Sequence, residues 1–156
     1  MGIKITLFIT FLLYAAVISQ SFFYILAMSK VMKGMQVSSY IETRQLLDKN
    51  LRPNLGGVYY ATLLASIALT ALCVTNPSGL LFGCSIISLL ALIVDLALTV
   101  KGNLPINREM NNWTIHSYPK NWNQYRRRWM SVYQVRQAVN LTGFIILLAG
   151  MVFGLN

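Results

Sequence analysis

The sequence has few acidic residues and lacks the residue clusters that most metal sites and hydrolytic active sites require. Its 156 residues include 4 Asp and Glu against 13 Lys and Arg, a single histidine, His116, and two cysteines. No CxxC or HExxH pattern is present, so no closed metal-ligand set is predicted. The chain also has no glycine-rich phosphate loop, nucleophile elbow or paired carboxylates. We expect no metal and no bound cofactor.

Apolar residues dominate what remains. Charged residues make up 11% of the chain and hydrophobic residues 56%, whereas soluble domains are about a quarter charged. Four apolar runs, residues 5–28, 58–75, 80–100 and 138–155, approach the roughly 20 residues that cross a hydrocarbon core as a helix. Because backbone in lipid must be hydrogen-bonded internally, we predict an all-α integral membrane four-helix bundle that forms one domain over residues 1–156.

Positive charge is distributed unevenly between the two sides of a four-span chain. The long connections 30–57 and 101–137 hold twelve of the 13 Lys and Arg, and Lys4 alone lies on the other side. Since Lys and Arg mark cytoplasmic loops, we predict an inner-membrane protein with both termini outside. The run 5–28 is longer than a usual signal-peptide core, so we expect it to be a retained span.

The formal net charge of +9 restricts the partners. The basic residues flank spans and have no nucleic-acid-binding module around them, so we expect contacts with anionic lipid headgroups and none with nucleic acid. A hydrophobic small molecule and partner membrane subunits are the other partners to consider.

The first cytoplasmic connection is predicted to be partly helical. Ser39 and Glu42 form a capping box, which indicates a helix to about Lys49. Pro53 and the glycine pair 56–57 are expected to break this helix before the second span.

The second connection contains a short predicted helix over residues 105–113, followed by a helix that starts at Asn121 and continues into the fourth span. At 100° per residue, one stripe of this second helix carries Trp122, Tyr125, Trp129, Tyr133, Arg136 and Asn140. The stripe is either an interfacial aromatic belt or an inward-facing surface. Arg136 and Asn140 favour the inward face, because they continue the stripe into the apolar region.

The other spans bring polar groups to a similar depth. Gln20 and Tyr24 lie in the cytoplasmic half of the first span, and Asp95 lies six residues before Lys101 in the third. A charge at a span's centre costs about 2.5–3.5 kcal/mol on insertion scales, so Asp95 needs a partner. We predict Arg136 as that partner, with Arg126 second. The pair either locks two helices together or belongs to a ligand site.

The opposite ends of the spans are rich in small residues. GxxxG patterns at 79–83 and 150–154 predict close helix packing there, with a more open bundle on the cytoplasmic side. Cys73 and Cys84 flank the turn at 76–79 at matching distances, which allows a disulfide but favours two buried small side chains.

One further set of residues is distributed along the chain: the run 103–107, Trp113, residues 121–122, residues 126–129 and Arg136, together with residues 21–24 in the first span. This set resembles the anthrone oxygenase-like family of small four-span membrane proteins, and residues 21–24 are similar to the opening of that family. It covers most of the chain as a dispersed pattern. It implies a four-helix membrane bundle whose characterised relatives oxidise anthrones to anthraquinones with O2, without a bound cofactor. By this resemblance, Asn107, Trp129 and Arg136 occupy motif positions.

One position departs from the family pattern. Where the family commonly has histidine, four residues after the tryptophan, this chain has Tyr133. If that histidine is the general base, this chain lacks it, and tyrosine is a poor base near neutral pH. Three functions stay open: oxidation of a hydrophobic aromatic substrate on the cytoplasmic side, with Arg136 and Tyr133 as catalytic candidates; binding of a quinone, haem edge or lipid without turnover; and an accessory role in a larger membrane complex.

Overall fold

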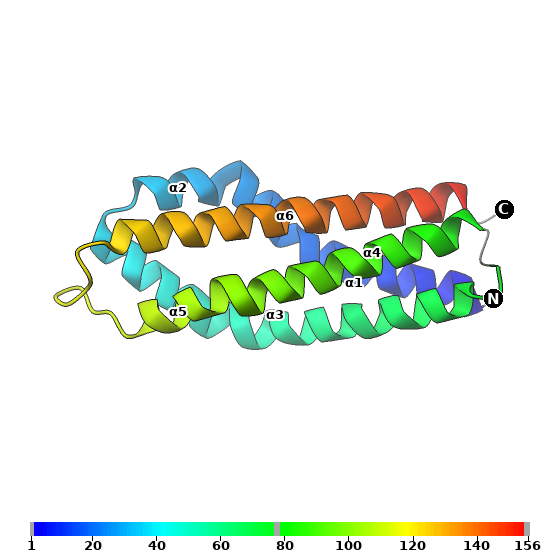
Figure 1. The fold of residues 1–156 in the computed structure, drawn as a ribbon, viewed down its shortest axis with the longest axis horizontal. Coiled ribbons are helices and arrows are strands. Elements are labelled where there is room, and N and C mark those ends of the chain that lie inside the picture. The colour runs from blue at the N-terminus through cyan, green and yellow to red at the C-terminus, as the bar shows by residue number, and fades with distance from the viewer. Residues whose placement is uncertain (1, 77–78, 155–156) are drawn as a thin grey trace.

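The computed structural model describes residues 2–76 and 79–154, and this part of the chain forms four long helices (Figure 1). The first comprises α1 (Gly2–Phe23), the π-helical segment η1 (Tyr24–Met28) and α2 (Ser29–Gly34), and the second is α3 (Val37–Cys73). The third comprises α4 (Leu80–Leu98), the π-helical segment η2 (Thr99–Asn103) and α5 (Leu104–Asn111), and the fourth is α6 (Trp122–Phe153). All four are long and apolar enough to cross a membrane. The predicted all-α, multi-pass membrane bundle is confirmed.

The bundle has two distinct ends. In Figure 1 the described ends of the chain lie at one end, together with the α3–α4 connection. The α2–α3 connection and the loop between α5 and α6 lie at the opposite end. We call these the terminal end and the loop end. The four helices contain 32 to 37 residues each, which exceeds the roughly 20 that a hydrocarbon core requires, so helical structure continues well beyond the apolar runs.

The helix α3 differs from the sequence-based prediction. It runs unbroken through Pro53 and both neighbouring glycines, so the predicted break before residue 58 is wrong. A proline removes one backbone donor, and neighbouring helices and side chains in a membrane bundle compensate for that loss. The predicted capping box is also wrong, because α3 begins at Val37 and its N-cap residue is Gln36.

The fourth helix follows the prediction. It begins at Trp122 with Asn121 as N-cap residue, although the Asn121 side chain makes no capping hydrogen bond, and it continues to Phe153 without interruption. The predicted short helix at 105–113 is found as α5, which is continuous with α4 through η2. The predicted end of the fourth span at residue 155, and residues 77–78 of the predicted turn, lie outside the described residues.

Small residues bring the helices together toward the terminal end. A Cβ atom on Gly143 would overlap the Tyr14 hydroxyl, and one on Gly150 would lie 2.6 Å from the Cβ of Cys84. The 150–154 GxxxG pattern therefore packs against α4, as predicted. Gly83 in the other pattern faces open space, so that pattern does not pack in the same way. Cys73 and Cys84 are buried and free.

Candidate functional site: an aromatic and arginine-lined pocket

A pocket of about 700 Å³ lies between the four long helices in the loop-end half of the bundle. This volume falls within the roughly 300–1,000 Å³ of small-molecule sites. Much of the wall is apolar, and includes Phe23, Met28, Met32, Leu47, Leu51, Leu55, Leu96, Val100 and Leu104. The lining residues Phe23 on α1, Leu51 and Tyr60 on α3, and Val100 on η2 are exposed, so the pocket reaches the surface of the bundle on both sides of α3.

Two of the four long helices depart from regular α-helix at the level of the pocket. Both π-helical segments line it, η1 through Tyr24 and Met28, and η2 through Thr99, Val100 and Asn103. Pro53 and the adjacent glycines of α3 line it as well. Single π-helical turns inside α-helices occur frequently at functional sites. The helix α6 is α-helical throughout and forms one wall of the pocket.

That wall carries a stack of two aromatic rings. The rings of Trp129 and Tyr133 lie one turn apart on α6, with centroids 4.6 Å apart and planes at 17°. Tyr24 meets Tyr133 edge-on, with a centroid distance of 4.5 Å. The guanidinium of Arg44 lies 3.8 Å from the Trp129 ring centroid, and that of Arg136 lies 5.3 Å from the Tyr133 centroid. Two cations therefore contact a central pair of rings, an arrangement that cation–π attraction stabilises.

Arg136 is held by the predicted carboxylate partner. Its Nε donates to Oδ1 of Asp95 at 2.7 Å, and Asp95 is fully buried. The Nη1 of Arg136 donates to Oδ1 of Asn103 at 3.1 Å. Arg126, the second predicted partner, instead donates to the main-chain oxygens of Met32 and Met35. A buried ion pair needs such additional hydrogen bonds, because its Coulomb attraction alone rarely repays the desolvation of both charges.

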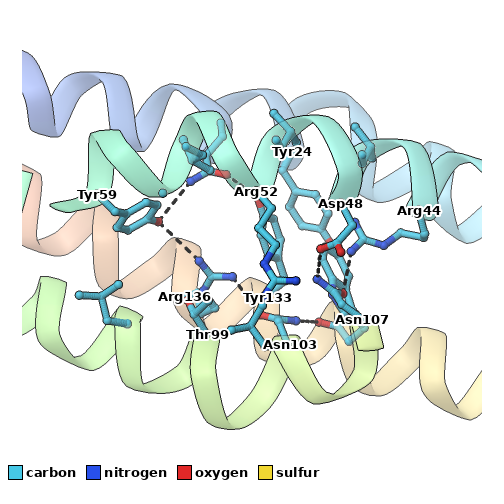
Figure 2. A pocket seen from close by; sticks show the side chains of 18 of the residues that line it. Tyr24, Arg44, Asp48, Arg52, Tyr59, Thr99, Asn103, Asn107, Tyr133 and Arg136 are labelled. Carbon is cyan, nitrogen blue, oxygen red and sulfur yellow. Dashed lines mark hydrogen bonds between the residues drawn. The ribbon is translucent and has the colours of Figure 1, made fainter. Parts of the chain in front are cut away.

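The Tyr59 hydroxyl links the helices on the other side of Arg136. The side-chain amides of Gln20 and Asn140 donate to it at 3.2 and 3.4 Å, and Nη2 of Arg136 donates at 3.5 Å. Tyr133 in turn donates its hydroxyl hydrogen to Oε1 of Gln20 at 3.1 Å. Polar residues from all four long helices thus share one network around the pocket floor (Figure 2).

A second network surrounds Asn107 nearer the loop end. The Oδ1 of Asn107 accepts hydrogen bonds from Nε1 of Trp129 at 2.8 Å and Nη2 of Arg44 at 2.9 Å. Its Nδ2 donates to Oδ1 of Asp48 at 2.9 Å, and Asn111 donates to the other Asp48 oxygen at 2.8 Å. Figure 2 shows Arg44, Asp48 and Asn107 gathered at this side of the pocket. Asn107 therefore fixes the orientation of Trp129.

The eight ligand-binding candidates from the sequence come together in this region. Six of them line the pocket: Gln20, Tyr24, Asn107, Trp129, Tyr133 and Arg136. Asp95 and Asn140 are buried behind this lining, and each is hydrogen-bonded to a residue that lines it. The first two residues of the predicted stripe do not line the pocket. Trp122 contacts Tyr40 instead, and Tyr125 contacts Trp113.

Sequence reasoning missed seven polar residues that line the pocket, namely Arg44, Asp48, Arg52, Tyr59, Tyr60, Thr99 and Asn103. The first three are spaced four residues apart, which places them along one side of a helix. That spacing was a usable signal, but the expected break at Pro53 separated these residues from the second span.

No protein-family model, curated protein or solved structure matches the chain. The fold and the site together define a multi-pass membrane protein with a four-helix bundle and an aromatic, arginine-lined pocket. Chemically, such a pocket suits a flat apolar molecule. The four hydrogen bonds of Arg136 leave one of its five N–H groups unassigned, and this group is suited to stabilise a negatively charged oxygen.

Proposed function

We propose that the protein binds a hydrophobic aromatic small molecule in this pocket and oxidises it with O2, in keeping with its resemblance to the anthrone oxygenase-like family. The observation that carries the proposal is the Trp129–Tyr133 ring stack beside Arg136, in a pocket that reaches the surface of the bundle beside α3. Flat aromatic molecules partition into membranes, so a side opening gives them a direct route to the stacked rings.

The chemistry requires a stabilised anion. In an anthrone, the ring CH2 group loses a proton to form an enolate-like anion, one O2 is consumed, and the carbon becomes a carbonyl with release of one water. We propose that Arg136, oriented by Asp95 and Asn103, stabilises the anionic oxygen. We propose Asp48 as the base, because it is the one carboxylate among the described residues that line the pocket.

Binding without turnover is the second candidate function. Tyr133 stands where the family commonly has histidine, and its hydroxyl hydrogen is already donated to Gln20. This observation favours a module that holds a quinone, a haem edge or a lipid against the same rings.

A direct assay separates the two functions. Purified protein in lipid nanodiscs would be incubated with anthrone under air, and both anthraquinone formation and O2 uptake would be measured. Oxidation predicts one anthraquinone per O2, a rate lowered about 10²–10³-fold in R136K, and little change in R128K, whose side chain lies outside the pocket. Saturable anthrone binding without product would support the binding function alone. Absence of both would contradict the proposal.

We also propose that the chain lies in the inner membrane with the loop end in the cytoplasm and both termini outside. The distribution of Lys and Arg supports this orientation. In a C73A/C84A background, T75C is expected to react with an impermeant maleimide on intact spheroplasts and K120C only after lysis. The reverse pattern would contradict the orientation.

A further inference from the structure

The pocket region carries more positive than negative charge. Arg44, Arg52 and Arg136 line the pocket, whereas the acidic groups in or directly behind the lining are Asp48 and Asp95. Asp95 is in direct contact with Arg136 and balances it. The two remaining arginines therefore share one carboxylate, which leaves a surplus of one positive charge.

Arg44 has unused donor capacity. Its side chain is buried, with 6% exposed, and within the described chain no carboxylate lies at ion-pair distance from it. Its Nη2 donates to Asn107, but its buried Nε has no hydrogen-bond partner. Asp48, one turn away, already accepts hydrogen bonds from two asparagine amides, one at each carboxylate oxygen. The buried hydroxyl of Tyr24, on η1, also lacks a partner.

Arg52 stands one turn beyond Asp48 on α3. It is exposed and lines the pocket, and the described part of the chain offers it no ion-pair partner. Figure 2 shows its side chain reaching from α3 into the pocket. Arg44 and Arg52, two turns apart on α3, thus both bring guanidinium groups to the pocket lining, and that of Arg44 lies over the Trp129 ring.

We infer that the ligand is an aromatic acid, a flat molecule with one carboxylate or ionised phenol. Its rings lie against the edges of the Trp129–Tyr133 stack, because Arg44 and Arg136 cover the outer faces of these two rings. Its anionic group lies between Arg44 and Arg52. One negative charge neutralises the surplus, and its oxygens accept hydrogen bonds from the unused donors. The inference rests on the proposed function, since it concerns the same pocket, and it adds the charge of the ligand.

Two probes of nearly the same shape separate the effect of the ligand's negative charge from the binding of its aromatic rings. Anthracene-2-carboxylate and neutral 2-(hydroxymethyl)anthracene would be titrated into protein in phosphatidylcholine nanodiscs at pH 7.5 and low salt. Saturable energy transfer from tryptophan would report binding. The carboxylate is expected to bind about tenfold more tightly or better, the size of one charge-assisted hydrogen bond. R52Q is expected to lose most of this preference and to keep its affinity for the alcohol.

The matched control is R128Q, which removes one exposed positive charge outside the pocket and is expected to keep the preference. Equal affinity for the two probes, or equal losses in R52Q and R128Q, would overturn the inference while leaving aromatic binding intact. If neither probe binds the unaltered protein, the proposed function fails as well.

Discussion

The two halves of the bundle are built from the same four helices but in different ways. Toward the terminal end, the helices are regular and small residues such as Gly143 and Gly150 bring them into close contact. Toward the loop end, two π-helical segments interrupt the regular pattern, α3 contains Pro53, and a pocket of about 700 Å³ lies between the helices. One half therefore holds the bundle together, while the irregular half contains the pocket in which we propose that a ligand binds.

Asp95 marks the boundary between the halves, and its loss is expected to have the largest effect. D95A leaves Arg136 buried without its counter-charge, which should destabilise the protein by about 3–5 kcal/mol. Reversible unfolding in mixed detergent micelles would measure the change. The double variant D95A/R136M should recover most of it, because no unpaired charge remains. A loss below about 1 kcal/mol in D95A would show that the pocket solvates Arg136.

The close packing of the other half gives the second prediction. G143A places a methyl group against the Tyr14 hydroxyl and the Cβ of Ala91, so we expect a loss of about 1–3 kcal/mol in the same unfolding assay. G83A is the matched control, since nothing lies within 4 Å of its added methyl group. It should be neutral or stabilising by up to about 1 kcal/mol. Similar losses in the two variants would remove the distinction between packed and open glycines.

The smallest effect is expected at the hydroxyl of Tyr133. Y133F keeps the ring stack on Trp129 and removes only the hydrogen bond to Gln20, so stability should fall by about 0.5–1.5 kcal/mol. Binding of 2-(hydroxymethyl)anthracene should change less than threefold, whereas Y118F, in the exposed α5–α6 loop, should change neither quantity. A large loss of probe binding in Y133F would mean that the hydroxyl, not the ring, holds the ligand.

Much of the fold was predictable because it depends on hydropathy. Four apolar runs were enough to predict four membrane helices, and the depth of Asp95 was enough to predict its pairing with Arg136. The continuity of α3 was not predictable, since proline and glycine are local signals of a break, whereas the packing of α3 against α1 and α4 is a property of the whole bundle. The roles of Arg44 and Tyr59 depend on how the helices are rotated against one another, which no single helix encodes.

The central claim is that the irregular half of the bundle is a ligand site for flat aromatic molecules. The most direct test is a crystal structure grown with 6-bromo-2-naphthoate, in which anomalous scattering locates the bromine atom. We predict one bromine peak inside the pocket, with the naphthalene rings against Trp129 and Tyr133 and the carboxylate facing Arg44. The claim would be contradicted if the lining side chains are all well defined and the pocket contains no bromine peak. A probe found only on the lipid-facing surface or near Gly143 would also contradict it.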